Sequence, residues 1–206
     1  MNEKKKLICV IVIFVILLCG GLLAYQKLKD GLNPPVLMTE APAETEALTE
    51  TDPETEISSE TEQSYQAPDF TFYDDDGNEY ALSDFFGKPI VLNFWSSTCP
   101  PCRSEMPEFQ EVYDEVGEDV QFLMMDCVGI YIGTGVETKK AALDFIEEEG
   151  LTLPVYFDST KNGVNTYGLS SFPTTFFIDK DGNLVTYGMG ALDKATLEKG
   201  ISMITE

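Results

Sequence analysis

The sequence predicts an α/β fold for residues 68–206, in which a central mixed β-sheet is flanked by helices. Two observations lead to this prediction. Short apolar runs alternate with amphipathic helical segments along the region, and clusters of turn residues separate them. Strands joined by helices favour parallel pairing, whereas hairpins near the two ends of the region add antiparallel strands.

The first half of this region predicts a hairpin, a buried strand and a helix. The runs 70–73 and 80–82 flank the turn residues 76–78, an arrangement typical of an N-terminal β-hairpin. Residues 90–95 are apolar at all positions but one, which predicts a buried strand, and helical character follows over 101–116.

The second half continues the alternation and ends on a hairpin and a helix. Gly150 closes one of the helices, and the turn at 180–183 joins the last two strands. The predicted strands cover 120–126, 155–158, 174–178 and 184–187, and the predicted helices cover 137–149, 161–167 and 194–201.

An apolar run near the N-terminus predicts a membrane-spanning helix. Residues 7–24 are just long enough to cross a hydrocarbon core of about 30 Å at about 1.5 Å per residue. The lysines at 4–6 are expected to stay in the cytoplasm, so that residues 1–29 form a single-pass anchor in the cell membrane and the rest is extracytoplasmic. A lipoprotein anchored at Cys19 and a cleaved signal peptide are the alternatives.

Residues 30–67 predict a disordered, acidic linker between this anchor and the globular region. The segment is rich in Thr, Glu and Pro and contains no Lys or Arg. It has too few large apolar residues to offset the entropy of ordering the chain. Its expected role is to hold the domain at a distance from the bilayer.

Composition excludes several classes of function. The formal net charge of −23 would repel phosphate backbones and anionic lipid head groups, so we expect no nucleic-acid partner. The chain contains no histidine, which removes Ser-His-Asp and Cys-His hydrolytic chemistry and histidine metal sites. Chemistry must therefore come from cysteines, carboxylates or hydroxyls.

Cys99 and Cys102 form a Cys-Pro-Pro-Cys motif between a buried strand and the start of a helix. At this position the first thiol faces unpaired backbone N–H groups at the positive end of the helix dipole, which lowers its pKa. Cys99 is therefore predicted to attack a substrate disulfide, and Cys102, one turn further and less exposed, to resolve the mixed disulfide. Pro100 and Pro101 carry no N–H and cannot donate to the thiolate.

The motif has two alternative interpretations. A structural zinc ion would need two further ligands, and only Cys127 and carboxylates remain in the globular region, so we expect no metal. A purely structural disulfide is the second alternative, although three cysteines in the globular region do not suit a disulfide scaffold. The only cofactor that we expect is the redox-active Cys99–Cys102 disulfide itself.

Residues 68–206 resemble the TlpA/ResA-like branch of the thioredoxin superfamily, whose members are extracytoplasmic thiol-disulfide oxidoreductases, commonly membrane-anchored. The resemblance covers nearly all of this region and implies a thioredoxin-like fold. The motifs that carry it are Ala67-Pro68-Asp69-Phe70, Leu82-Ser83-Asp84-Phe85, Asn93-Phe94-Trp95 with Cys99 and Cys102, Met106-Pro107-Glu108, Leu153-Pro154-Val155, Phe172-Pro173-Thr174-Thr175 and Asp179-Lys180-Asp181-Gly182.

The resemblance implies further site residues. Pro173 matches the cis-proline that the fold places opposite the dithiol, so Phe172 and Pro173 are expected to dock an extended substrate strand. Pro100 and Pro101 belong to the same expected substrate surface. Trp95, the only tryptophan in the chain, is expected to shield one side of the dithiol and to contact substrate.

Glu105 matches a glutamate that similar proteins place near the thiol pair, three residues after Cys102. A partly buried carboxylate there could accept and return the Cys102 proton. Thioredoxins use a buried aspartate for this task, but this chain has Asn93 at that position, which cannot titrate. For Cys127 two readings stay open, a buried small residue or a regulatory third thiol.

The family reading predicts a reductase of protein disulfides, acting in cytochrome c maturation or in the repair of oxidised proteins, with a CcdA-like membrane protein as the possible electron donor. One alternative is a peroxiredoxin-type peroxidase. That class needs a threonine three residues before its reactive cysteine and an arginine beside it, whereas this chain has Ser96 there and Arg103 as its only arginine. The other alternative is a redox-silent docking module on a membrane stalk.

Overall fold

The computed structural model describes residues 37–38 and 65–205. The predicted membrane anchor at 1–29 and most of the predicted linker at 30–67 lie outside these residues. Among the residues described, no helix combines the length and the apolar character that crossing a bilayer requires.

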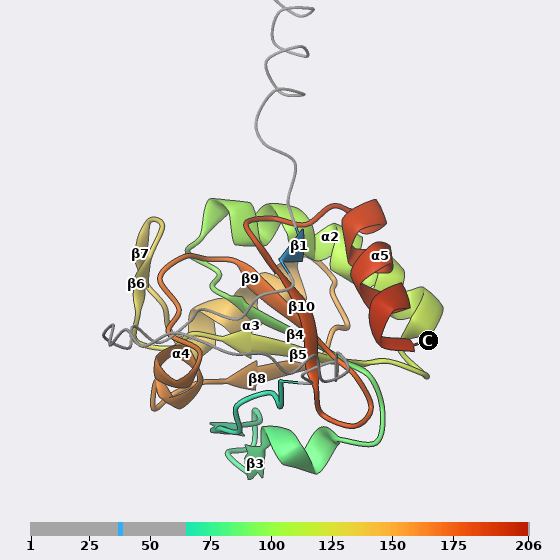
Figure 1. The fold of residues 1–206 in the computed structure, drawn as a ribbon. Coiled ribbons are helices and arrows are strands. Elements are labelled where there is room, and N and C mark those ends of the chain that lie inside the picture. The colour runs from blue at the N-terminus through green and yellow to red at the C-terminus, as the bar shows by residue number, and fades with distance from the viewer. Residues whose placement is uncertain (1–36, 39–64, 206) are drawn as a thin grey trace, which may run out of the picture. The chain divides into compact units, whose positions relative to one another are not determined.

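The described part of the chain is an α/β domain with a mixed sheet of eight strands (Figure 1). The central strands β4, β5 and β8 pair in parallel, and all other neighbours in the sheet are antiparallel. The order across the sheet is β1 (Leu37–Met38), β10 (Leu184–Met189), β9 (Thr174–Ile178), β4 (Ile90–Trp95), β5 (Gln121–Asp126), β8 (Val155–Phe157), β2 (Thr71–Tyr73) and β3 (Glu79–Ala81).

Helices α2 (Pro100–Val116) and α3 (Lys139–Glu148) connect the parallel strands. Both connections advance across the sheet in the same direction, so right-handed crossovers place both helices on one face. Helix α5 (Lys194–Thr205) packs beside α2, and the short helix α4 (Asn162–Thr166) packs near β2. This is the predicted arrangement of a central mixed sheet flanked by helices.

The most strongly patterned elements agree with the sequence-based predictions. Strands β4 and β9 have the predicted bounds, and every residue of both is buried. The predicted N-terminal hairpin is present as β2 and β3, and a 3-10 helix over Leu82–Phe85 follows it directly. Helix α2 begins one residue earlier than predicted because Cys99 caps it and Pro100 suits the first helical position.

The helix that was predicted to begin at residue 137 begins instead at Lys139. Thr138 is its N-cap, since its side chain accepts a hydrogen bond from the Ala141 N–H. Glu137 lies before the helix and is buried. A hairpin of two short strands, β6 (Tyr131–Ile132) and β7 (Gly135–Val136), precedes it and was not predicted.

Two stretches within the range 30–67 of the predicted linker belong to the described residues. Leu37–Met38 pairs with β10 as strand β1, so the free backbone groups along that sheet edge gain partners. Residues 65–67 also belong to the domain, because Leu184 N donates to Tyr65 O at 2.8 Å and Ala67 N donates to Gly182 O at 2.9 Å. The ordered domain therefore starts before residue 68.

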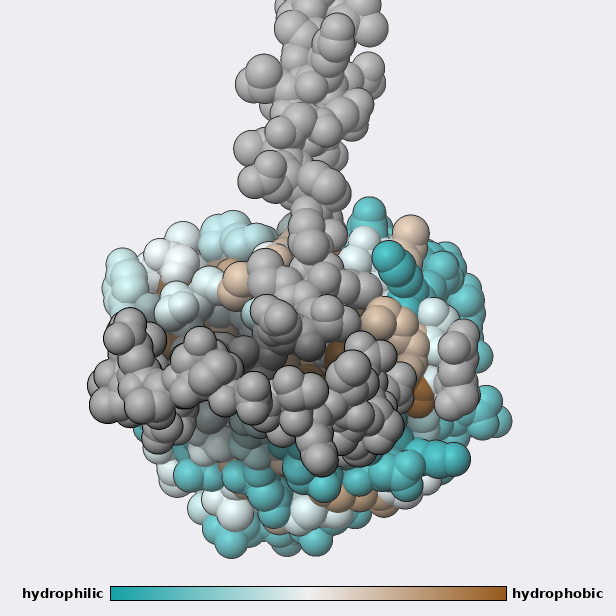
Figure 2. Space-filling model, viewed as in Figure 1, coloured by the Kyte–Doolittle hydropathy of each residue, from teal (hydrophilic) through white to brown (hydrophobic). Residues whose placement is uncertain are grey.

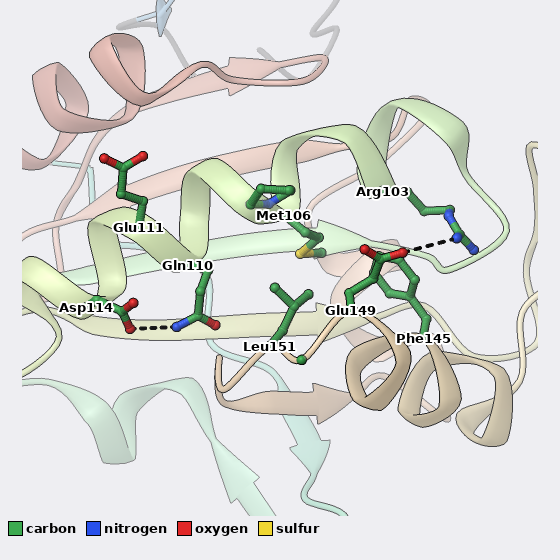
Figure 3. Close-up of a pocket in the computed structure, with 10 residues that line it drawn as sticks. Arg103, Met106, Gln110, Glu111, Asp114, Phe145, Glu149 and Leu151 are labelled. Atoms are coloured by element: carbon green, nitrogen blue, oxygen red, sulfur yellow. Dashed lines mark hydrogen bonds and ion pairs between the residues drawn. The ribbon is translucent and has the colours of Figure 1, made fainter.

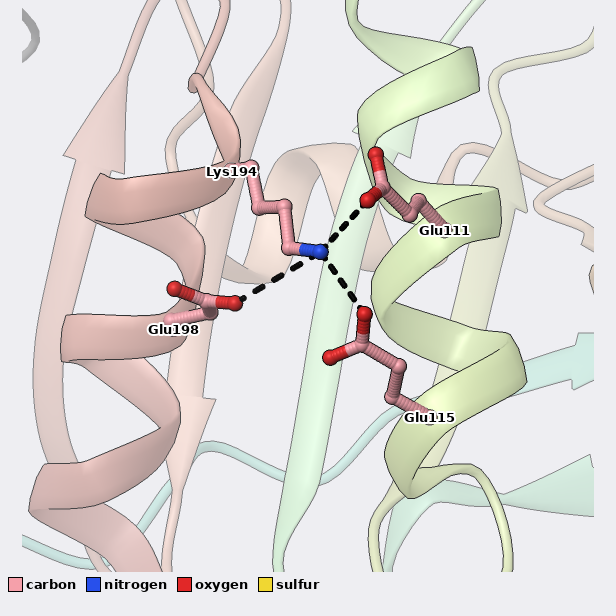
Figure 4. Close-up of polar contacts among 4 residues, drawn as sticks. All are labelled: Glu111, Glu115, Lys194 and Glu198. Carbon is pink, nitrogen blue, oxygen red and sulfur yellow. Dashed lines mark hydrogen bonds and ion pairs between the residues drawn. The ribbon is translucent and has the colours of Figure 1, made fainter.

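Helices α2 and α5 are joined by an ion network at the surface (Figure 4). The Lys194 ammonium lies 2.6 Å from Glu111 and 2.7 Å from Glu115 on α2, and 3.8 Å from Glu198 one turn along α5. The hydrogen bonds to Glu111 and Glu115 raise the pKa of Lys194. These exposed pairs fix the position of α5 against α2 and contribute little to stability individually.

Candidate functional site

The two cysteines of the motif form a disulfide at the N-terminus of α2. Strand β4 ends at Trp95 and four residues form the loop to the helix. Cys99 is the N-cap residue, and its sulfur accepts a hydrogen bond from the Cys102 N–H at 3.4 Å. The predicted placement of the first thiol at the positive end of the helix is therefore present.

The two sulfur-bearing residues differ slightly in exposure. Cys99 is 2% exposed and Cys102 is fully buried, whereas Pro100 and Pro101 between them are exposed. The small exposed surface of the pair therefore belongs to Cys99, next in sequence to the exposed Pro100 and Pro101.

The loop that contains Pro173 lies against the disulfide. The Phe172–Pro173 peptide bond is cis, as predicted. The carbonyl oxygen of Phe172 lies 3.8 Å from the Cys99 sulfur, and the Phe172 side chain is half-buried. Pro173 is buried, and its carbonyl oxygen accepts a hydrogen bond from the Gly190 N–H at 2.9 Å.

Glu105 lies on the buried face of α2, one turn after Cys102, and is 1% exposed. Its two oxygens accept hydrogen bonds from Asn93 Nδ2 at 2.9 Å and from the Leu192 N–H at 3.0 Å. Burial raises the pKa of Glu105 to about 8, and the two hydrogen bonds oppose this in part. The side chain is more deeply buried than the sequence suggested.

Asn93 has a role that the sequence analysis missed. Its Nδ2 group donates both to Glu105 and to the hydroxyl of Thr175 on the neighbouring strand, each at 2.9 Å. The Asn93 Oδ1 atom has no hydrogen-bond partner among the described residues. Asn93 therefore positions the Glu105 carboxyl group. The signal available in the sequence was a single amide within an otherwise apolar strand.

The expected substrate contact at Trp95 is corrected by its burial. The side chain is fully buried and packs against Phe145 of α3, with ring centroids 5.8 Å apart. A fully buried ring cannot touch a substrate, so Trp95 belongs to the core behind the site. Trp95 is the last residue of the buried strand β4, and burying its indole ring removes a large apolar area from water.

The loop between Trp95 and Cys99 is held by Glu137, a residue that the sequence analysis assigned only to the start of a helix. The Glu137 carboxylate accepts hydrogen bonds from Ser96, Ser97 and the Thr98 N–H. Ser96 and Ser97 are themselves buried. Their contacts with Glu137 span about 40 residues of sequence, which local patterns do not reveal.

A third buried acidic group, after Glu105 and Glu137, lies where β5 ends. Both carboxyl oxygens of Asp126 lack hydrogen-bond partners among the residues described, and burial together with the Glu137 charge raises the pKa of Asp126 to about 9. Burial likewise raises the pKa of Asp158 and of the neighbouring Cys127 thiol. Cys127 is fully buried and is the one free cysteine in the described part of the chain, which agrees with the expected small core residue.

Two grooves lie on the side of α3, and one of them reaches the loop that holds the disulfide. One of about 480 Å³ runs from Pro100 to Thr134 of the β6–β7 hairpin. The other, of about 310 Å³, continues between α2 and the end of α3 (Figure 3). Arg103 separates them, since it stacks on the Phe145 ring at 4.4 Å and pairs with Glu149 at 3.7 Å. On the face drawn in Figure 2, the described surface is mostly hydrophilic.

No group of three or more histidine, cysteine or acidic side chains within the described ranges is arranged to hold a metal ion.

The chain matches the model of the AhpC/TSA family over residues 64–187. The chain belongs to this family. A thiol-disulfide oxidoreductase ResA from Bacillus thuringiensis is 36% identical over 141 residues, which cover 68% of this chain and 77% of the relative. With the Cys99–Cys102 pair at a helix N-terminus, this family member is a thiol-disulfide oxidoreductase of the ResA type.

Solved structures of family relatives agree on the fold. A putative thiol:disulfide interchange protein DsbE from Chlorobium tepidum is 27% identical with a TM-score of 0.58, covering 68% of this chain and 94% of that one. The pneumococcal exposed lipoprotein thioredoxin Etrx1 from Streptococcus pneumoniae is 33% identical with a TM-score of 0.53, covering 65% and 98%. The fold is therefore thioredoxin-like.

Proposed function

We propose that this oxidoreductase acts outside the cytoplasmic membrane as a reductase of protein disulfides. The observation that carries the proposal is the position of Cys99, which caps α2 beside the Phe172 carbonyl and is the only cysteine of the pair with exposed surface. A nucleophilic sulfur beside the backbone of the Phe172–Pro173 loop suits a polypeptide substrate better than a small one, because an extended strand can lie along that backbone.

The reaction transfers two electrons from the dithiol to the substrate. The Cys99 thiolate attacks one sulfur of a substrate disulfide, which forms a mixed disulfide and releases one substrate thiolate. Cys102 then loses its proton and attacks the Cys99 sulfur, which closes the Cys99–Cys102 disulfide and releases the second substrate thiolate. A dithiol donor returns the pair to the reduced state, so no cofactor beyond the disulfide is needed.

The remaining site residues take supporting roles in this proposal. Glu105 is the group that accepts the Cys102 proton, since both lie on the buried face of α2. Phe172 and Pro173 dock the substrate backbone, and the exposed Pro100 and Pro101 form the opposite side of the contact surface.

The natural substrates that fit this chemistry are cysteine pairs oxidised to disulfides, either in the haem-binding motif of a c-type cytochrome before haem attachment or in misoxidised proteins. A CcdA-like membrane thiol carrier is the electron donor that we propose.

Reduction of insulin tests the proposed activity. With dithiothreitol as the electron source, catalytic amounts of the chain should accelerate insulin-chain precipitation well above the rate with dithiothreitol alone, since a positioned thiolate exchanges faster than a free thiol. Turbidity at a fixed pH measures this rate. A chain that left the rate unchanged would be a redox-silent docking module, and one that consumed hydrogen peroxide but not insulin would be a peroxidase.

We also propose that residues 1–29 anchor the chain in the cell membrane with the catalytic domain outside. The lysines at 4–6 and the apolar run 7–24 support this topology. Attachment through a lipid on Cys19 is the alternative anchor, and the similarity to an exposed pneumococcal lipoprotein is compatible with it.

Protease treatment of intact cells tests the topology. Protease added outside should release a fragment that contains the domain, because the predicted linker separates the domain from the anchor and is expected to be cleaved. Immunoblotting of the medium detects the fragment, and a cytoplasmic protein that stays intact is the control. If the domain is degraded only after the cells are lysed, it lies in the cytoplasm and the proposed topology is wrong. Replacing Cys19 with alanine separates the two anchors, since only a lipid anchor depends on that thiol.

A further inference from the structure

Glu137 is the most fully hydrogen-bonded acidic side chain near the disulfide that the reaction above does not use. It is 1% exposed and ends the β6–β7 hairpin, just before α3. Its backbone is fixed on both sides, since its N–H donates to Ile130 O and its carbonyl oxygen accepts from the Gly129 N–H, each at 2.9 Å. The side chain is therefore presented from a rigid position.

The carboxylate collects donors from three consecutive residues of the loop before Cys99. Its Oε1 atom accepts from the Ser97 hydroxyl at 2.8 Å, and Oε2 accepts from the Thr98 N–H at 3.0 Å and from the Ser96 hydroxyl. Oε1 also accepts from the Thr138 N–H at 3.0 Å. An ionised carboxylate has acceptor sites and no donor, which matches a pocket made only of donors.

The hairpin that carries Glu137 closes on the same loop from outside. The Thr98 hydroxyl donates to Ile132 O at 2.7 Å, and the Thr134 N–H donates to Thr98 O at 2.9 Å. Gly133 has a φ of +60°, and a side chain there would meet the Thr98 carbonyl and the Cys99 Cα atom at less than 3 Å. Only glycine fits this approach, so hairpin and loop are shaped as one unit.

We propose that Glu137 is the positioning residue of the redox centre, which fixes the loop at Ser96, Ser97 and Thr98 so that the Cys99 sulfur is held within bonding reach of Cys102. This inference rests on the proposed function and adds a residue that acts through the loop without touching substrate. Holding the two sulfurs together raises their effective concentration and favours the disulfide over the dithiol. The Glu137 carboxylate contacts Thr98, the residue before Cys99, so its negative charge also disfavours the Cys99 thiolate, which acts in the same direction.

Equilibrium with glutathione measures this effect in the full-length chain. Glutathione disulfide oxidises the dithiol to the Cys99–Cys102 disulfide and releases two glutathione thiols. Thiol trapping followed by peptide mass spectrometry reports this pair separately from Cys9, Cys19 and Cys127. Glu137→Gln keeps the side-chain size but places an NH₂ group against one of the donors. We expect the equilibrium constant for disulfide formation to fall roughly tenfold, a potential about 30 mV less reducing.

Glu148→Gln is the control, because it makes the same Glu-to-Gln change at an exposed position of α3. It should leave the equilibrium constant unchanged. Ser97→Ala should lower the constant by less than Glu137→Gln, and the double variant should match Glu137→Gln, because both changes break the same contacts. If Glu137 served folding alone, Glu137→Gln would change the unfolding midpoint and leave the equilibrium constant for disulfide formation unchanged.

The outcomes separate cleanly. A parent chain that exchanges no disulfide with glutathione or insulin overturns the proposed function, and this inference with it. A parent that exchanges normally, with Glu137→Gln equal to it or with Glu148→Gln shifted equally, overturns the positioning role alone. If Glu137→Gln does not fold, the double variant of Ser96→Ala and Ser97→Ala decides, and an unchanged equilibrium constant overturns the proposal.

Discussion

Replacing Cys99 with serine is expected to abolish insulin reduction, whereas replacing Cys102 with serine should accumulate a mixed disulfide. Cys99 caps α2 and has the only exposed surface of the pair, so its sulfur meets the substrate first. A serine hydroxyl is not a nucleophile toward disulfides at neutral pH. Without Cys102 the first exchange still occurs, but nothing resolves it. Non-reducing electrophoresis of the chain with insulin would display the trapped adduct.

Cys127→Ala is the control for this pair of variants. Cys127 is free but fully buried, and burial raises the pKa of its thiol, so the alanine variant should reduce insulin at the parental rate. Alanine is chosen over serine because a hydroxyl would have to be buried there. Full activity in Cys99→Ser would show that Cys99 is not the nucleophile. A Cys127→Ala variant that folds but has lost activity would show that Cys127 takes part in the reaction.

Sequence patterns predicted the elements in which one local signal dominates. Strand β4 follows from an apolar run, and helix α2 was predicted to within one residue of its start from the helical pattern after the cysteine motif. The cis bond before Pro173 was predicted from the resemblance to the family, because a single sequence gives no measure of bond isomer.

The contacts that complete the site were not predictable in this way. Strands β6 and β7 have two residues each, which is too short for any periodicity to appear. Glu137 precedes Thr138, and acidic residues are common in the first turn of a helix, so the sequence favoured a helical position for it. Its contact with Ser97 exists only in the folded chain. Glu105 likewise accepts from Leu192, 87 residues away. Buried polar contacts of this range depend on how the sheet is assembled, which local propensity does not specify.

The Glu105→Gln variant is expected to resolve mixed disulfides about a hundredfold more slowly at pH 8, in line with the lower range of general acid–base catalysis. Because burial raises the pKa of Glu105 to about 8, the carboxyl group is mostly protonated at pH 7 and ionises as the pH rises. Only the ionised form can accept the Cys102 proton. Stopped-flow measurement of mixed-disulfide resolution should therefore show a rate that rises through pH 8 in the parent and lacks this rise in the variant.

The fold should tolerate the substitution because Asn93 can turn its amide. Asn93 Oδ1 has no partner among the described residues, so a flipped amide could accept from the new side-chain NH₂ and from the Thr175 hydroxyl. The pH dependence of stability gives an independent check. With a folded pKa near 8 and an ordinary value of 4.5, the unfolded chain binds fewer protons between these values, so the parent loses stability as the pH rises through this window. The Glu105→Gln variant should lose less stability over the same pH range.

Glu108→Gln provides the matched control for Glu105→Gln. It makes the same change on the same helix at a partly exposed position, so it should leave both the resolution rate and the pH dependence of stability as in the parent. A Glu105→Gln variant with the parental rate profile from pH 5 to 9, but with the altered stability profile, would show that the buried carboxyl titrates without serving Cys102. The proton would then pass to water or to the departing substrate thiolate, and the contacts of Glu105 with Asn93 and Leu192 would be structural only.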